Sequence, residues 1–292
     1  MCSLWRAVVG GTVAIVAVAI VATSFGAVID EPPGFSYAEF RVNEAVAMWL
    51  LVYDRMAWHS SDVVIQESQE ELNKLGSEWF CLESGGLWHA FYGRYDPAAE
   101  TYHVVFHYVY HENTGFISTD ETIDESTLAT YGRALHNSLI RLPESITSLD
   151  VRFNLYIRSL GDGTLEVWIL PAGQPDGTLV YGGDIHYVLD STGSEFLDEQ
   201  LNFTRFYAIR PAPDLELDID REENDVPSVG DIFFLLSFRD QFEDVAVWTR
   251  CFRTNMLDVE GQESSWLHVE RPGIDCTGKS EKQPKEDADQ LD

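Results

Sequence analysis

The stretch from residue 7 to residue 28 constrains this chain more than any other. It contains 22 residues without a charged side chain, follows Arg6 and precedes Asp30 and Glu31. A helix buried in a soluble domain would keep a polar side, and this run has none. A transmembrane helix needs about 20 apolar residues, whereas a signal peptide has a shorter apolar core and small residues at its cleavage site. The length fits an anchor and the small residues at 22–26 fit cleavage, so both interpretations stay open.

Both interpretations predict the same topology. Positive residues next to an apolar segment stay in the cytoplasm, so Arg6 places the remainder of the chain across the membrane. We therefore expect a signal peptide or membrane anchor at 1–30, and an exported domain, membrane-anchored or secreted, at 31–276. Residues 277–292 contain acidic residues but no aromatic ones, which predicts a disordered acidic tail. The membrane, reached through the N-terminal segment, is the one partner that the sequence predicts.

The charge of the chain excludes one class of partner. There are 49 Asp and Glu residues against 19 Lys and Arg, and the formal net charge is −30. Such a field repels nucleic acids, so we do not expect nucleic-acid binding. The acidic residues are spread along the chain, which favours a saline habitat or general solubility over a dedicated acidic site. A hydrophobic fraction of 45% and an aromatic fraction of 12% predict an ordered core.

Three cysteines follow the apolar run, at Cys81, Cys251 and Cys276. An exported compartment permits disulfides, but an odd number allows at most one bridge within the chain. Cys251 and Cys276 flank a hairpin-like segment, and we expect these two to pair. Cys81 lies in an aromatic strand pattern, which favours a small buried residue. The absence of a Cys-x-x-Cys motif gives no indication of a thioredoxin-type or zinc-knuckle site.

The first part of the domain repeats one order of elements. Apolar residues spaced by three and four predict helices, and alternating aromatic and β-branched residues predict strands. The expected helices are 37–58 with Ser36 as cap, 60 or 61 to 75, and 124 or 126 to 141; the expected strands are 78–83, 87–95, 102–111, 151–160, 165–170 and 178–189, with a polar loop at 115–124. This order suggests two α-β-β-β units, 36–112 and 124–190.

The remaining residues predict a third group of strands within 203–270. A short helix is expected at 194–201, followed by strands at 203–209, 214–220, 231–238, 245–253 and 264–270. In 214–220, acidic and aliphatic residues alternate strictly, as in a strand with one solvent-exposed face. Together these elements predict an α+β fold, in which antiparallel β-meanders pack against segregated helices.

Histidines form the sharpest chemical pattern. His103, His107 and His111 recur every four residues, but on a strand such neighbours lie about 13 Å apart, too far to share a metal ion. A shared site needs partners from other strands. His89 is expected opposite His107, and His186 could approach from the second meander, so we consider a His89/His107/His186 metal site. The competing interpretation is a sheet face that uses histidine as an amphipathic residue.

No sequence motif specifies a reaction or a cofactor. We find no nucleophile elbow, Walker loop or dinucleotide fingerprint. The leading hypothesis is therefore a non-catalytic exported protein that acts by binding or assembly. One alternative is a metal-assisted hydrolase that uses the histidines with Glu112 or Asp184. Another is an apolar small-molecule carrier, in which aromatic residues line a groove instead of forming only core; the candidates are Trp79, Trp88, Tyr92, Phe106 and Tyr108.

Overall fold

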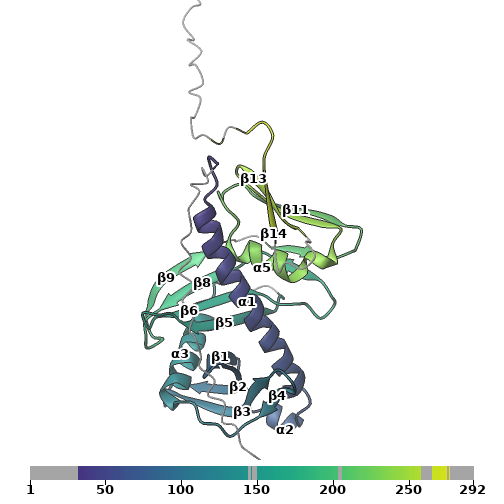
Figure 1. The fold of residues 1–292 in the computed structure, drawn as a ribbon. Coiled ribbons are helices and arrows are strands. Elements are labelled where there is room, and N and C mark those ends of the chain that lie inside the picture. The colour runs from purple at the N-terminus through teal and green to yellow at the C-terminus, as the bar shows by residue number, and fades with distance from the viewer. Residues whose placement is uncertain are drawn as a thin grey trace, which may run out of the picture. The chain divides into compact units, whose positions relative to one another are not determined.

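The computed structural model describes residues 32–143, 146, 150–202, 206–257, 265–274 and 276 (Figure 1). The chain divides into two units, Met1–Glu31 and Pro32–Asp292, and the second contains every described element. The predicted apolar segment at 7–28 and the predicted tail at 277–292 lie outside the described residues. Within the described part, none of the helices combines the length and the apolar character that a bilayer crossing requires.

The first helix begins where the sequence predicts but is longer. Helix α1 (Tyr37–Val64) starts after Ser36, whose hydroxyl accepts the cap hydrogen bond. The predicted break at Ser60 is wrong, because this residue is buried inside the helix. Its hydroxyl donates to the carbonyl of Ala57 and lies 2.8 Å from the hydroxyl of Tyr92. A serine that bonds to the preceding turn leaves the helical backbone intact, so the helix continues.

The first sheet is an antiparallel meander with strand order β1-β2-β3-β4. After the short helix α2 (Gln69–Leu72), its strands are β1 (Phe80–Ser84), β2 (Leu87–Asp96), β3 (Thr101–His111) and β4 (Gly115–Ser118). The three predicted strands are confirmed. The predicted loop at 115–124 is wrong at its start, because Phe116 pairs with Tyr110 and is buried there.

The second sheet follows α3 (Glu125–Arg141), the helix predicted at this position, whose N-cap is Asp124. Its strand order is β5-β6-β8-β9, all antiparallel. The strands are β5 (Phe153–Ser159), β6 (Leu165–Pro171), β8 (Ile185–Leu189) and β9 (Phe196–Leu201). The helix predicted at 194–201 is wrong, because this segment pairs with β8 as an exposed edge strand.

The strand predicted at 178–189 is interrupted. Gly182 and Gly183 both have positive φ, at 94° and 73°, a conformation that glycine adopts most readily. They turn the chain out of one sheet and into another. The part before them, β7 (Leu179–Tyr181), pairs with β10 (Tyr207–Ile209), and the part after them is β8. This bend places Asp184 between the two sheets.

The third four-stranded sheet contains the one parallel pair among the described strands. Its order is β11-β12-β13-β14, and β11 runs parallel to β12. The elements are β11 (Glu216–Arg221), α5 (Val229–Phe238), the 3-10 turn η1 (Arg239–Gln241), β12 (Asp244–Thr249), β13 (Phe252–Leu257) and β14 (Ser265–Glu270). A parallel pair needs a crossover connection, and α5 provides it. The strand predicted at 231–238 is therefore wrong.

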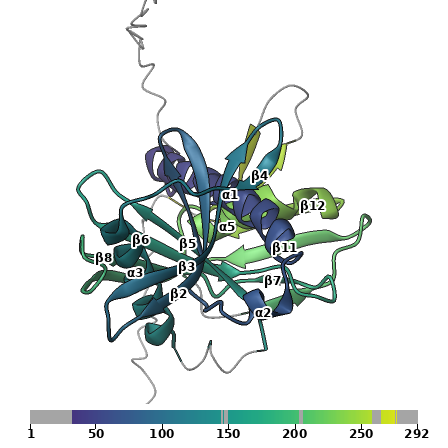
Figure 2. The same cartoon turned by 90° about the horizontal axis from the view of Figure 1, so that it is seen from below.

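Helices lie on both sides of the strands of the first two sheets (Figure 2). Strand β1 lies beside β5, so the sheets adjoin. Ala90 and Tyr156 belong to the core under α1, whereas Phe91 and Ile157, which follow them in the chain, belong to the core under α3. Helix α5 packs along α1. The α+β class with mostly antiparallel sheets is confirmed, with helices on both faces.

Of the three cysteines in the domain, two form a disulfide and one is free. Cys251 and Cys276 form a disulfide, with Cα atoms 5.8 Å apart, and Cys81 is free and buried. The sulfur of Cys251 lies close to Gly34, where an added Cβ would come within 2.9 Å of it. The bridge therefore links the β12–β13 turn to a residue that follows β14, and it packs against the segment that leads into α1.

Candidate functional site

Two of the three histidines considered for a metal site lie together. Nδ1 of His89 is 2.9 Å from Nε2 of His107, and the His107 ring stacks on Phe91. Burial, and then the neighbouring His89, lower the pKa of His107. His186 lies in the second sheet, where its Nε2 is 2.9 Å from Oε1 of Glu166. Across the described residues, no three His, Cys, Asp or Glu side chains form a group that could hold a metal ion.

The two carboxylates considered for the hydrolase lie apart from this pair. Glu112 is exposed in the turn between β3 and β4. Asp184 is buried in the bend between β7 and β8, beside residues of α5. The structure therefore does not gather the histidines and these carboxylates into one site.

The neighbourhood of Asp184 contains a sealed charge cluster. Nη1 of Arg221 donates to Oδ1 of Asp231 at 2.9 Å, and the hydroxyl of Tyr181 donates to the same oxygen. The amide of Ser228 donates to the other oxygen, Oδ2, at 2.7 Å, as part of the capping box of α5. Arg221 also donates to the carbonyl of Asn202 at 2.7 Å. Arg221 and Asp231 are at most 1% exposed, and both oxygens of Asp231 are satisfied within the protein.

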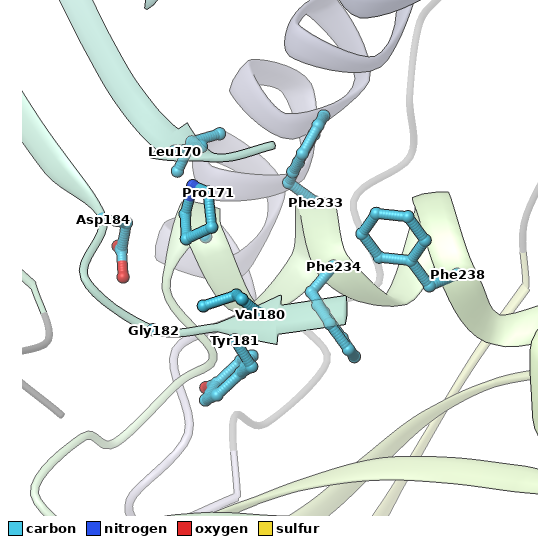
Figure 3. A pocket seen from close by; sticks show the side chains of 10 residues that line it. Leu170, Pro171, Val180, Tyr181, Gly182, Asp184, Phe233, Phe234 and Phe238 are labelled. Carbon is cyan, nitrogen blue, oxygen red and sulfur yellow. The ribbon is translucent and has the colours of Figure 1, made fainter. Parts of the chain in front are cut away.

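Asp184 itself is less well satisfied. Its Oδ2 is buried and has no hydrogen-bonding partner in the described part of the chain. Burial, and then the charge of Asp231, raise the pKa of Asp184 to about 6, although Arg221 opposes this. Figure 3 shows the cavity beside it, with Asp184 on one side and Phe238 on the other. The cavity measures about 20 Å³, enough for about one water molecule and too small for an organic ligand.

An open groove of about 630 Å³, which Phe238 also lines, offers far more room. Helix α1 forms one wall, and the first and second sheets contribute the others. Its lining residues are Asp54, Ala57, Trp58, Ser61, Trp79, Tyr92, Arg152, Phe153, Asn154, Ala172, Gly173 and Phe238. A concave site with apolar walls and few polar groups is the usual form of a small-molecule site.

Five of the twelve residues that line the groove are aromatic. Trp79 and Tyr92 stack nearly parallel, with ring centroids 5.9 Å apart. Trp58 is 68% exposed, which is unusual for so large an apolar side chain. Of the aromatic residues considered from the sequence, Trp79 and Tyr92 line the groove. The others do not: Trp88 packs on Tyr53, Phe106 stacks on Tyr108, and Tyr108 donates to Glu67.

The groove also contains separate negative and positive groups. Oδ1 of Asp54 accepts hydrogen bonds from the Tyr156 hydroxyl at 2.8 Å and from the Asn154 amide at 3.1 Å. Its Oδ2 has no partner in the described chain, and burial raises the pKa of the carboxyl. The guanidinium of Arg152 makes no hydrogen bond or ion pair with the described residues. Both groups are therefore available to a ligand.

Sequence reasoning missed these polar groups. Asp54 and Asn154 are 100 positions apart, and only the packing of α1 against β5 brings them together. One signal was present: Asp54 lies between Tyr53 and Met56, which belong to the apolar face of the predicted helix. A carboxylate beside such a face needs a partner, although the sequence does not say which.

Comparison with known proteins adds no assignment to this geometry. No protein-family model, curated protein or solved structure matches the chain. The chemistry of the site therefore carries the functional argument.

Proposed function

We propose that the folded part of this chain is a non-catalytic binding protein whose small-molecule ligand occupies the groove beside α1. The observation that carries the proposal is that one groove is lined by an exposed tryptophan, Trp58, and by a desolvated carboxylate, Asp54, one oxygen of which has no partner among the described residues. Exposed aromatic surface and a partly desolvated carboxylate both cost free energy in the empty protein. A ligand that covers the ring and bonds to the oxygen removes both costs.

The polar groups of the groove favour binding over catalysis. The hydroxyl of Ser61 donates to the carbonyl of Trp58 at 2.7 Å, so Asp54 does not activate it as a nucleophile. Oδ1 of Asp54 is held by Tyr156 and Asn154, which fixes the orientation of the carboxylate. A fixed carboxylate between aromatic walls is suited to recognition.

We also propose that the domain acts outside the cytoplasm, secreted or tethered through the N-terminal segment. Two observations support this proposal: the uncharged run at 7–28 and the disulfide between Cys251 and Cys276. Disulfides persist mainly in oxidising compartments. Protease accessibility of the C-terminal part in intact host cells tests it. Protection of that part inside the cytoplasm would overturn the proposal.

Ligand binding is tested by screening a broad panel of small molecules for quenching of tryptophan fluorescence. We expect hits whose binding is lost in Trp58→Ala and retained in Ile65→Ala. Ile65, at the end of the same helix, is 69% exposed and does not line the groove, so it is a matched control. The proposal fails if no compound in the panel binds in a manner that depends on Trp58.

A further inference from the structure

We infer that the ligand of the groove is a small zwitterion that carries a methylated ammonium group at one end and a carboxylate at the other. This inference rests on the proposed function and names the ligand class for the same site. It follows from three features of the groove: its aromatic residues, a carboxylate oxygen and a guanidinium, the last two without a partner among the described residues.

The aromatic walls favour a cationic group of low hydration. Trp58, Trp79 and Tyr92 all line the groove, and tryptophan is the ring that attracts cations most strongly. The attraction acts through the negative face of the ring and needs no N–H donor. A methylated ammonium is weakly hydrated, so it loses little on leaving water, whereas a primary ammonium would have to give up its strong hydrogen bonds to water. Its methyl groups also cover the apolar surface of the rings.

The carboxylate of Asp54 adds the negative charge that such a group requires. Burial raises its pKa, so the charged form is less well solvated in the empty groove than in water. Tyr156 and Asn154 satisfy only Oδ1. A methylated ammonium beside Oδ2 would supply a positive charge without disturbing these two hydrogen bonds. Aromatic rings and a carboxylate together form the type of cage that recognises quaternary ammonium groups.

Arg152 is the residue that would bind the carboxylate end of the ligand. Arg152 lines the same groove, and its guanidinium forms no ion pair with Asp54 or with any other described residue. Guanidinium groups bind carboxylates in a two-pronged geometry. A ligand with a net negative charge would be repelled by a chain of net charge −30. A zwitterion avoids this repulsion and still offers a carboxylate to Arg152.

Calorimetric titration of the full chain with glycine betaine tests the inference. The matched control ligand is 3,3-dimethylbutanoate, which has the same shape and the same carboxylate but a carbon in place of the charged nitrogen. We expect glycine betaine to bind at least about 10-fold more tightly, as a desolvated cation–π contact implies. Equal affinity of the two ligands, or no detectable binding of glycine betaine, would overturn the inference.

Two variants, with one control, test which residue binds each end of the ligand. Asp54→Asn should weaken the binding of glycine betaine at least about 10-fold and should not weaken the binding of the anion 3,3-dimethylbutanoate. Asp62→Asn, an exposed carboxylate two turns further along α1 and outside the groove, should change neither. Arg152→Met should weaken glycine betaine and leave tetramethylammonium, which has no carboxylate, unchanged. Binding of glycine betaine that is unaffected by Asp54→Asn contradicts the inference, and unchanged melting temperatures show that the variants fold.

The ligand class and the proposed function can fail separately. If other compounds bind in a manner that depends on Trp58 but glycine betaine does not, the groove is a binding site and the ligand class is wrong. If no compound depends on Trp58, the proposed function fails, and the ligand class fails with it.

Discussion

The groove and the sealed cluster each have a desolvated carboxylate beside them, but only the carboxylate in the groove is accessible to a ligand. Burial raises the pKa of both Asp54 and Asp184. Both carboxylates keep an oxygen without a partner in the described chain. Phe238 lines the cavities beside both. Yet Asp54 faces a groove of about 630 Å³ and Asp184 a cavity of about 20 Å³. The same desolvated charge can recruit a ligand where it is accessible, and can only weaken the fold where it is sealed.

The largest expected effect is a difference in stability between variants of two arginines, Arg221 in the sealed cluster and Arg152 in the groove. Arg221→Met should lower the free energy of unfolding by about 3–5 kcal/mol, because it leaves Asp231 buried without its countercharge. Arg152→Met, in the groove, should change it by less than about 0.5 kcal/mol, because Arg152 is exposed and its guanidinium forms no ion pair with the described residues. Urea unfolding of both variants measures the difference. Similar losses in the two variants would break the contrast between the regions.

The second prediction concerns the pH dependence that Asp184 imposes. Its pKa in the folded protein, about 6, lies above the ordinary value of 3.8, so the folded state binds the proton more tightly than the unfolded state. Stability from this group is therefore present at low pH and lost as the pH rises through about 6. Asp231, Arg221 and Asn202 are the groups that act on this carboxyl, and burial is the largest cause.

Asp184→Asn removes that dependence, because an amide does not titrate. Relative to the native chain, the variant should gain about 2 kcal/mol of unfolding free energy between about pH 4.5 and about pH 8. Urea unfolding at the two pH values measures it. A gain that is equal at both pH values would show that Asp184 titrates as an ordinary carboxyl. The comparison between a sealed and an accessible carboxylate would then lose its energetic basis.

A third prediction compares a glycine from each region. At Gly230, an added Cβ would lie 2.6 Å from Cγ of Asp184, whereas at Gly173, in the groove, it would meet nothing within 4 Å. Gly230→Ala should destabilise by about 1–3 kcal/mol, the usual cost of overpacking. Gly173→Ala should be neutral or slightly stabilising, since alanine restricts the unfolded chain. Thermal unfolding of the two variants provides the test, and equal melting temperatures would contradict the close packing around Asp184.

The sequence predicted elements whose periodicity is unambiguous. Helix α1 begins at its predicted cap, and β2 and β3 form the predicted hairpin. Helix α5 was missed because Val229–Phe238 is apolar on nearly all sides, and a short apolar run has no period that separates a buried helix from a buried strand. The capping box of Ser228 and Asp231 was the available signal. The edge strand β9 was missed because pairing with β8 overrides its weak local preference.

The candidate site was predictable only in part. Trp79 and Tyr92 were candidates because aromatic residues on neighbouring strands lie close together. Asp54, Arg152 and Asn154 could not be joined to them, because the groove forms where α1 meets the ends of two sheets. Contacts between residues that lie about 100 positions apart depend on the tertiary arrangement, which periodicity does not specify.

The smallest expected effect on stability belongs to Trp58. Because it is 68% exposed, Trp58→Ala should change the free energy of unfolding by less than about 0.5 kcal/mol. We expect a tryptophan that contributes so little to the fold, yet lines the same groove as Asp54, to act in ligand binding. Urea unfolding of the empty variant measures the first part, and fluorescence titration measures the second. A loss of several kcal/mol would instead place Trp58 in the core, and the groove would then resemble the sealed cluster, with side chains that serve only the fold.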